Sequence, residues 1–419
     1  MPRGRIGARA VKVTVRPLDS AELREGVDRL RTLVYPPVPP HFIPVDTEWH
    51  HSVWRWLASH PLGSEMHRWV LVTEEGEVVG HLAATPQYYR INGRRVVAHT
   101  PADYQVLPGY GFHALLLMRK FFRTCQNYLA CDMVPAVIDV ETRMGGQEVG
   151  KLEYRAKLLN VSRLPVPPVP APIRRRLNLP EWAAPARGYA NPAGEAREVD
   201  ARSQPAPPPV RPRAPIPAPL RGLLNEGLGA VDAALGKAFG GDHEVEVLKG
   251  FDSSFDALFE EVAASVPCVA EKDAAFLRWR YGPGSPAAPV TVLGVREGGQ
   301  RLLGYAVLKV ATWGPDEGRD SGLLDLATLP GRHDVARSLL RGTVRRLRKA
   351  GAHIIRYRFM ESPTSPRPED LWRLGFFPRN DRRHTLLAKL ADLGLNEVAV
   401  DPANWSYSIG DGEATFWVR

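Results

Sequence analysis

The sequence predicts an α/β protein, with mixed sheets of the α+β kind, built from two units of the same type. At 419 residues the chain exceeds the usual size of a single hydrophobic core. A strand, a glycine-rich turn and an apolar helix follow one another over 99–122, HTPADYQVLPGYGFHALLLMRKFF. A similar strand at 321–327 again leads into a helix rich in leucine and arginine, through a turn with one glycine instead of two.

Composition and charge narrow the classes of function. The net charge of +9 comes mainly from arginine and suits an anionic ligand, although an arginine-rich proteome explains it equally well. No short basic run is interleaved with aromatics, so nucleic-acid binding is not expected. The three cysteines form no Cys-x-x-Cys pair, which argues against a zinc site and a disulfide framework. We therefore expect no metal.

The sequence shows neither a secretory signal nor a membrane-spanning run. The basic start MPRGRIGARAVKV is not followed by the apolar core of a secretory signal. No run approaches the ~20 apolar residues that a membrane-spanning helix needs. We therefore expect a cytoplasmic protein without a membrane span.

The first unit is predicted to cover residues 1–164. Alternation of valine with polar residues indicates a strand at 11–16, and Asp19 or Ser20 caps the helix that follows. Prolines exclude a helix from 35–46, and Asn92-Gly93 is a strong hairpin turn. The predicted elements are helices at 21–33, 49–59 and 114–129, and strands at 11–16, 69–73, 78–84, 87–91, 94–98, 135–141 and 150–164, the last after a turn.

A linker is predicted over 165–243. Residues 165–219 are dominated by proline, alanine and arginine, a composition that cannot bury a core, although it could recruit a partner that binds proline-rich segments. A helix at 220–239 has its leucines on one face. Its polar face has only Arg221 and Lys237 as basic residues, so docking on its own protein is favoured over a membrane surface.

The second unit is predicted to cover 244–419 and repeats the order of the first. Because the period is near half the chain, a duplicated domain explains it better than a solenoid. The predicted elements are helices at 251–265, 271–279, 334–349 and 368–374, strands at 290–296, 302–311, 322–327, 354–360 and 383–389, and an ordered aromatic end from 404 to 419.

The glycine-rich turn has the features of an anion site. Backbone N–H groups in such a turn and at a helix start have no partner within the helix, and the helix dipole adds partial positive charge there. A pyrophosphate fits without any basic side chain. Gly109 and Gly111 could also be no more than a tight turn.

This order resembles the GNAT superfamily of N-acetyltransferases. The family has a basic or amide residue, two variable positions, Gly, a variable position, then Gly or Ala. Here Gln105 precedes Gly109-Tyr110-Gly111 and stands one position too far from it. Leu374-Gly375-Phe376 resembles the late family signature. The segments 276–281 and 404–412 resemble two-domain GNAT-like proteins found with bacterial surface-polysaccharide genes.

The resemblance implies an acyltransferase in which an amine attacks the thioester of acetyl-CoA or another acyl-CoA. The donor would bind along the turn, with a backbone N–H near Tyr104–Val106 polarising the carbonyl. The acceptor would be a small amine, such as an amino sugar, entering between the units. The donor-binding residues would be Val106, Leu107, Gly109, Tyr110, Gly111, Phe112, His113 and Ala114. The catalytic candidates are Asp103 and Glu141 as bases and Tyr154 as the acid for the thiolate.

Other interpretations stay open. Asp103 and Glu141 also suit solvated positions, and Tyr154 suits the core. Asp325 on the second central strand becomes the base if the second unit is the active one. Arg280, between two aromatics, would either fix a helix end or face the space between the units. Tandem GNAT folds also resemble N-myristoyltransferases and Fem-type aminoacyl transferases, where usually one half keeps the donor site. A catalytically silent binding or scaffold protein is the alternative from another class.

Overall fold

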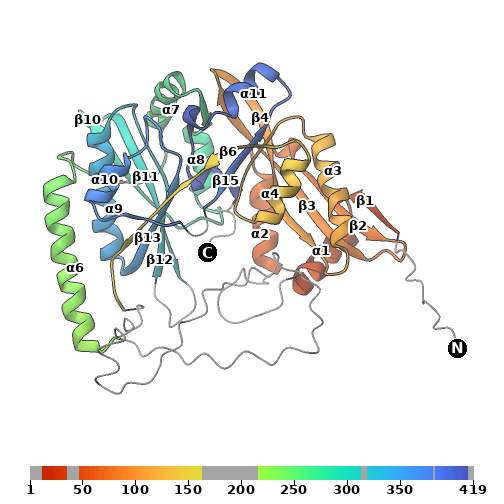
Figure 1. The fold of residues 1–419 in the computed structure, drawn as a ribbon, viewed down its shortest axis with the longest axis horizontal. Coiled ribbons are helices and arrows are strands. Elements are labelled where there is room, and N and C mark those ends of the chain that lie inside the picture. The colour runs from red at the N-terminus through yellow and green to blue at the C-terminus, as the bar shows by residue number, and fades with distance from the viewer. Residues whose placement is uncertain (1–11, 35–46, 163–215, 313–318, 381–382, 414–419) are drawn as a thin grey trace, which may run out of the picture.

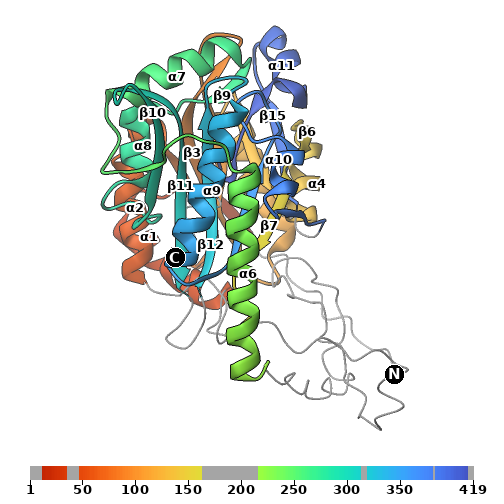
Figure 2. The ribbon, with the colours of Figure 1, turned by 90° about the vertical axis from the view of Figure 1, so that its left-hand side faces the viewer.

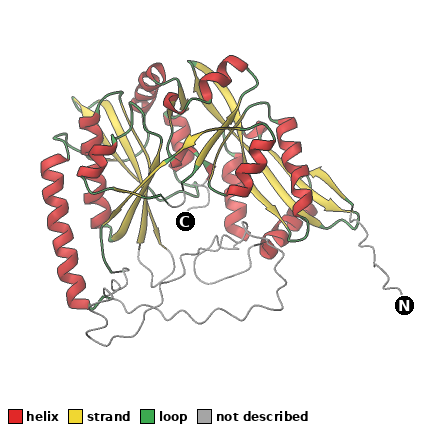
Figure 3. Cartoon of the chain, in the orientation of Figure 1, coloured by secondary structure: helices red, strands yellow, loops and turns green. Residues whose placement is uncertain are grey.

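The computed structural model describes residues 12–34, 47–162, 216–312, 319–380 and 383–413. Two mixed sheets lie next to each other, and each has helices on both faces (Figures 1 and 3). This confirms the predicted α/β class. The predicted loop at 35–46, the proline-rich part of the linker up to residue 215 and the last six residues of the predicted ordered end lie outside the described residues.

The first sheet has the strand order β1-β2-β3-β4-β5-β15-β6, with β9 attached to β3 and β16 attached to β9. Only β4 and β5, and β9 and β16, pair in parallel. The strands are β1 (Val13–Pro17), β2 (His67–Thr73), β3 (Val78–Ile91), β4 (Arg94–Val106), β5 (Tyr128–Asp132), β6 (Gln147–Lys151), β9 (Cys268–Ala270), β15 (Thr385–Lys389) and β16 (Trp405–Ser406).

The second sheet has the order β14-β7-β13-β12-β11-β10-β8. Its parallel pair is β12 with β13, the counterpart of β4 with β5. The strands are β7 (Glu153–Leu158), β8 (Glu246–Leu248), β10 (Thr291–Glu297), β11 (Arg301–Thr312), β12 (Arg319–Thr328), β13 (Ala352–Phe359) and β14 (Phe377–Pro378).

Helices cover the first sheet from both sides. Leucines and valines of α1 (Ala21–Val34), with Trp54 of α2 (Thr47–Ala58), pack on Val70, Val72 and Val78. On the opposite face α3 (Ala114–Thr124) buries Leu117, Met118 and Phe121, and α4 (Pro135–Arg143) packs beside it. These helices present apolar residues three and four positions apart, which is why one side of each is buried.

Helices also cover the second sheet. Asp252 and Asp273 cap α7 (Ser253–Ser265) and α8 (Ala274–Tyr281), and α7 packs on β11. The long α9 (His333–Lys349) lies on β10 to β13, with α10 (Pro368–Arg373) beside it. The helix α6 (Ala218–Phe239) packs on the outer side of α9 and α10, at the left-hand edge in Figure 1 and in front in Figure 2. The helix α11 (Leu393–Ala399) packs near β15.

The two halves exchange strands. The chain passes from β6 in the first sheet to β7 in the second across the single residue Leu152. There β7 pairs with β13 and β14, which belong to the second half. In return β15 of the second half lies between β5 and β6 of the first. The sheets therefore do not follow the boundary predicted at residue 164.

Two strands that the sequence predicted as separate form one continuous strand that contains a proline. The predicted strands 78–84 and 87–91 form one strand, β3, which contains Pro86. On its outer side β3 pairs with β2 up to Ala84 and with β9 from Tyr89 onward. Pro86 lies between these two partners, where no outer neighbour needs its missing N–H.

Two predicted elements after the glycine turn were wrong. The helix predicted to reach residue 129 ends at Thr124, and Tyr128–Asp132 is the buried strand β5. The strand predicted at 135–141 is the helix α4. Pro135 stands at its first turn, a position where the fixed φ and the missing N–H of proline favour a helix start.

Candidate functional site

The parallel strands β4 and β5 separate soon after they meet. Their ladder has one residue pair, His99 with Tyr128, and the His99 N–H donates to Asn127 O. Two residues later the same side of β4 carries Pro101, which has no N–H to continue the ladder. We call the space between Pro101–Val106 and Leu129–Asp132 the first fork.

A bulge in β4 places Asp103 in a buried ion pair. The β3–β4 register shifts between His81 and Ala83, and Asp103 has a φ of 51°. Its carboxylate accepts from Arg31 Nη2 at 2.5 Å and also from Gln105, and His81 Nδ1 lies 3.3 Å away. Burial alone would raise the pKa of Asp103, but Arg31 and His81 hold the pKa well below its usual value. A structural ion pair accounts for this residue, so it is poorly suited to be a base.

The turn after β4 presents unpaired backbone N–H groups. Tyr110 N–H donates to Leu107 O and His113 N–H to Tyr110 O. Within the described residues, the N–H groups of Gly109, Gly111 and Phe112 find no acceptor. Three such groups beside the start of α3 form an arrangement suited to an anion.

Glycine suits positions 109 and 111 of this turn for different physical reasons. Gly109 has a φ of 97°, which favours glycine because a Cβ is strained in the left-handed region. Gly111 does not lie in this region, and a Cβ there would meet no protein atom within 4 Å. Neither strain nor packing requires glycine at position 111, whereas the close approach of a ligand to the backbone would.

Glu141 lies fully buried beside the first fork. Its carboxylate has no well-formed hydrogen bond to another described residue, and the Tyr128 hydroxyl lies near it. Burial raises the pKa of Glu141 to about 8, Asp132 adds to the rise, and Tyr128 partly offsets it. Burial and then Glu141 raise the pKa of Tyr104, which places this tyrosine within electrostatic reach of the carboxylate.

The first fork is rich in carboxylates. Burial raises the pKa of Asp132, although the Val134 N–H, 2.7 Å from its Oδ1, partly offsets the rise. Burial raises the pKa of Glu413 well above its usual value, and Asp132, Asp103 and Glu141 add to this. Carboxylates that are difficult to ionise together become easier to ionise when a cation lies among them. Within the described ranges no group of side chains has the arrangement of a metal site.

The remaining predicted site residues are only partly brought together. Leu107, Tyr110 and Val106 pack on the core beneath α3, Phe112 is 84% exposed, and Ala114 begins α3. His113 has a buried Nδ1 without a partner. Tyr154 lies on β7 in the second sheet, where its hydroxyl accepts from Arg356 at 3.2 Å. It therefore does not join the first fork.

The corresponding fork of the second half is filled by its own chain. Here β12 and β13 pair from Arg319 to Leu323 and then separate. The short helix η4 (Ile409–Asp411) contacts both strands, and Ser408 bridges to Phe359. A Cβ at Gly410 would lie 2.6 Å from Leu324 O. The same segment continues toward the first fork, since a Cβ at Gly412 would lie 3.5 Å from Cys131 Cβ and Glu413 lies within electrostatic reach of Asp132.

Buried ionic contacts fix this closure. Lys272 Nζ lies 2.9 Å from Asp325 and 3.0 Å from Asp411, and Ser408 Oγ donates to Asp325 at 3.0 Å. The Tyr305 hydroxyl donates to Asp325 at 2.8 Å. Asp325, the base candidate of the second unit, is thus part of a closed network.

The second turn is also satisfied by the protein. Gly331 N–H donates to Pro363 O. Asp334 in the first turn of α9 accepts from Arg332 at 2.8 Å and lies 2.7 Å from His243 Nε2. Arg332, helped by His243, lowers the pKa of Asp334 well below its usual value. A carboxylate of the chain therefore occupies the place where a ligand anion would bind.

Two parts of this site differ from the sequence-based expectation. Tyr128 was placed in a helix, although the run Tyr-Leu-Ala-Cys-Asp after Asn127 is short and apolar, as buried strands often are. The closure of the second fork depends on residues more than 80 positions apart, such as Asp325 and Ser408, and leaves no local signal.

Comparison with solved structures identifies the fold. A probable N-acyltransferase from Enterococcus faecalis matches with a TM-score of 0.51 at 8% identity, over 92% of this chain and 74% of its own. A GCN5-related N-acetyltransferase from Anabaena variabilis matches with the same score and coverage at 10% identity. N-myristoyltransferase from Saccharomyces cerevisiae, solved with myristoyl-CoA and inhibitors, gives 0.51 at 12%, over 90% and 80%.

These matches confirm the predicted tandem GNAT fold, since each extends over both halves of the chain. At such low identities they establish the fold alone. The sequence itself matches no model of a protein family and no curated protein.

Proposed function

We propose that this chain is an N-acyltransferase that binds an acyl-CoA donor at the turn Val106–Ala114 and carries out the reaction at the first fork and not at the second. The tandem GNAT fold supports acyl transfer in general. The difference between the two forks supports the choice of half, because the chain itself fills the second fork and neutralises the second turn.

One observation carries the proposal most directly. The N–H groups of Gly109, Gly111 and Phe112 have no acceptor in the described chain, and the space beside Gly111 is open. These groups would hold the pyrophosphate of the donor, with His113 Nδ1 nearby as a further polar group. The residues present therefore fit the ligand, which would supply the acyl group as a thioester.

The backbone of β4 offers a donor for the carbonyl oxygen. Leu107 N–H donates to Val79 O on β3. Because N–H groups alternate sides along a strand, that of Val106 points away from β3 and into the first fork. We propose that it polarises the thioester carbonyl, as a fixed dipole directed at the charge that develops there.

Glu141 is the proposed proton acceptor. A base works best when its pKa lies near the working pH, and burial raises the pKa of Glu141 to about 8. Because the carboxylate is fully buried, Tyr104 would pass the proton from the attacking amine to it. The ion pair of Asp103 and the position of Tyr154 in the other sheet leave these two predicted candidates without such a path.

The acceptor is proposed to be a small amine that is cationic in solution. Asp132, Glu141 and Glu413 would ionise more readily with an ammonium group among them, and the opposite charges would then hold the amine at the fork. An amino sugar is one such amine, and its recognition would need further contacts between the protein and the sugar ring. With acyl-CoA as the donor, we place the reaction in the bacterial cytoplasm.

A thermal-shift titration with acetyl-CoA and longer acyl-CoA esters tests the donor site. A ligand at about 100 times its dissociation constant raises the free energy of unfolding by about 2.7 kcal/mol. We expect this stabilisation in the wild type and its loss in Gly111→Val, whose side chain would fill the cradle. Gly250→Val is the matched control, because a Cβ at position 250 also meets open space but lies far from the turn in sequence.

The outcomes separate the alternatives. No shift with any acyl-CoA ester would favour a silent GNAT-like protein. An unchanged shift in Gly111→Val would move the donor away from this turn. For an aminoacyl transferase of the Fem type, we would instead expect aminoacyl-tRNA binding that weakens steeply with salt, because it depends on phosphate contacts.

A further inference from the structure

The helix α6 exposes an apolar face over much of its length. Leu223 is 67% exposed and Val231 is 54% exposed, and Leu220 and Leu224 lie on the same side of the helix. On the neighbouring α10, Trp372 is 63% exposed. Exposed apolar side chains gathered on one side of a helix mark a contact site for a partner or a membrane.

Glycines bring α6 close to the basic helix α9. A Cβ at Gly236 would lie 3.4 Å from Arg341 Cγ, and one at Gly240 would lie 2.7 Å from Arg341 Cδ. A Cβ at Gly229 would lie 3.8 Å from Arg348 Nη1. The arginine stems of α9 therefore pack directly on the α6 backbone.

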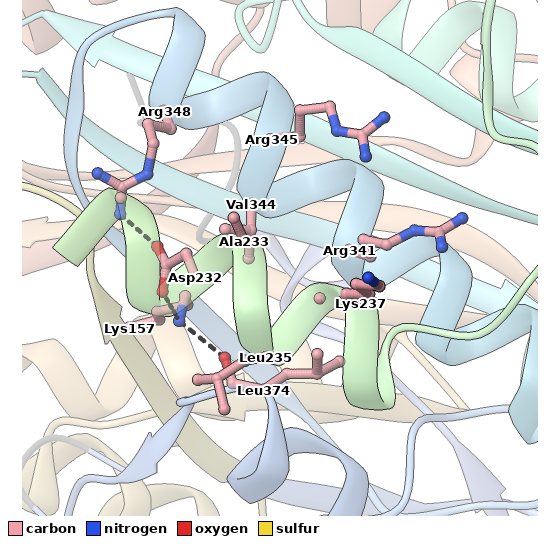
Figure 4. A pocket seen from close by; sticks show the side chains of 12 residues that line it. Lys157, Asp232, Ala233, Leu235, Lys237, Arg341, Val344, Arg345, Arg348 and Leu374 are labelled. Atoms are coloured by element: carbon pink, nitrogen blue, oxygen red, sulfur yellow. Dashed lines mark hydrogen bonds and ion pairs between the residues drawn. The ribbon is translucent and has the colours of Figure 1, made fainter. Parts of the chain in front are cut away.

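A cavity of about 350 Å³ lies between these helices (Figure 4). Val344, Leu235 and Leu374 give it an apolar lining. Five cationic side chains also line it, against the single carboxylate of Asp232. We call this cavity, with its lining residues, the α6–α9 groove.

Asp232 neutralises only the inner part of this charge. It lies 2.6 Å from Lys157 Nζ and also pairs with Arg348. Arg341 donates to the carbonyl oxygens of Gly241 and His243, which carry no net charge. Lys237 and Arg345 have no acidic partner in the described chain. The groove therefore combines an apolar lining with an excess of cations, around the buried ion pair of Lys157 with Asp232.

We propose that this surface docks on an anionic membrane, with a lipid phosphate in the α6–α9 groove and the apolar face of α6, together with Trp372, entering the interface. A groove with an apolar lining and an excess of cations fits an amphiphilic anion. Exposed leucines and tryptophan next to lysine and arginine are typical of interfacial binding. In the described chain no helix is long and apolar enough to cross a bilayer, so the contact is peripheral.

Charge favours a membrane over a second copy of the chain. Two copies that packed through this face would place Lys237, Arg341 and Arg345 against the same cations of the partner. An anionic surface attracts these groups and accepts the leucines at once. The basic face that α6 itself lacks is thus supplied by α9.

Cosedimentation of the full-length protein with vesicles tests the proposal. We expect binding to phosphatidylcholine vesicles that contain about 30% phosphatidylglycerol, little binding to phosphatidylcholine alone, and release by high salt. At about 1 kcal/mol for each basic residue near the surface, the variant Lys237→Gln/Arg345→Gln should bind roughly 30-fold more weakly. Leu223→Ser should also bind more weakly, because it removes an exposed apolar side chain.

The matched control is Arg16→Gln/Arg29→Gln. It makes the same change in net charge on β1 and α1, where both side chains are exposed, at the opposite end of the molecule (Figure 1). It should bind vesicles nearly as well as the wild type. An equal loss of vesicle binding in both double variants would exclude the groove as the binding site, because net charge alone would then explain the binding.

Further outcomes would overturn the proposal. Absence of binding to phosphatidylglycerol vesicles at low salt would do so. So would a dimer in sedimentation equilibrium that Leu223→Ser dissociates, since the face would then belong to a second copy. The third is a thermal stabilisation by glycerol phosphate as large as that by phosphatidylglycerol vesicles, because the groove would then bind a soluble anion. Unfolding curves confirm that each exposed substitution leaves the fold intact.

Discussion

The rings of Trp56 on α2 and Trp279 on α8 stack across the two halves, with centroids 4.3 Å apart and planes 8° from parallel. Each indole N–H donates to the main-chain carbonyl of the other tryptophan, at 2.7 Å and 3.1 Å. The pair joins the halves through both stacking and hydrogen bonds. Arg280, the next residue of α8, is buried and donates from Nη2 to Gly410 O at 2.5 Å, so it binds the segment that closes the second fork.

Trp279→Ala should lower the free energy of unfolding by about 3 kcal/mol, as large aromatic truncations do. The reason is the loss of the stacked ring and of an indole donor, with the Trp56 N–H still facing a main-chain oxygen. Urea denaturation measures the change. Trp372→Ala is the control, because Trp372 is 63% exposed and its removal should lower the free energy of unfolding only slightly. Equal effects of the two substitutions would argue against a special role for the stacked pair.

Glu141→Gln should reduce kcat/KM by about 10² to 10⁴, the usual contribution of a general base. In the wild type kcat/KM should rise with pH and level off above about 8, because the carboxylate must be ionised to accept a proton. The variant should lose this rise. Asp139→Asn on the same helix is the matched control, since Asp139 is exposed and pairs only with Arg143. A pH profile unchanged by Glu141→Gln would exclude it as the base.

Glu141 should also make stability depend on pH. Its pKa is raised in the folded protein, so its stabilising contribution is present below about pH 4.5 and is lost as pH rises through about 8. A pKa that differs by one between the folded and unfolded chains changes the free energy of unfolding by about 1.4 kcal/mol. Glu141→Gln should therefore gain stability relative to the wild type between these pH values. Parallel stability curves for the two proteins would contradict the raised pKa.

Lys272→Met should destabilise the second half by about 3–5 kcal/mol, because Asp325 and Asp411 would remain buried without a counter-charge. Adding Asp325→Asn and Asp411→Asn should restore part of the loss. Chemical denaturation gives both values. Arg301→Met is the control, since its ion pair with Glu261 is exposed and should contribute less than about 1 kcal/mol. An equally small effect at Lys272 would show that the closure does not depend on the buried charges.

Local patterns predicted much of the fold. The hairpin at Asn92-Gly93, the helix α7 and the helix α9 follow from turn chemistry and apolar spacing, and the structure confirms them. The strand β5 was missed because Tyr128–Asp132 is short and continues the apolar pattern of α3. A tertiary pairing with β15 decides its conformation, and no local window contains that pairing.

The same distinction between local and distant contacts applies to the proposed site. The turn at Gly109–Ala114 depends on adjacent residues and was found from them. The ion pair of Asp103 with Arg31 joins residues 72 positions apart, and sequence spacing does not reveal it. The same holds for Ser408 and the short helix η4, which close the second fork, because Ser408 meets Asp325 only in the folded chain.

The exchange of β7 and β15 has a consequence for how the protein is made. Residues 1–162 leave the ribosome long before β15, so β5 and β6 must wait with unpaired edges until Thr385–Lys389 emerges. Unpaired strand edges are the usual starting points of aggregation. A truncated chain that stops after the first half should be insoluble by itself. The two halves therefore share one folding event, however separate their duplicated sequences look.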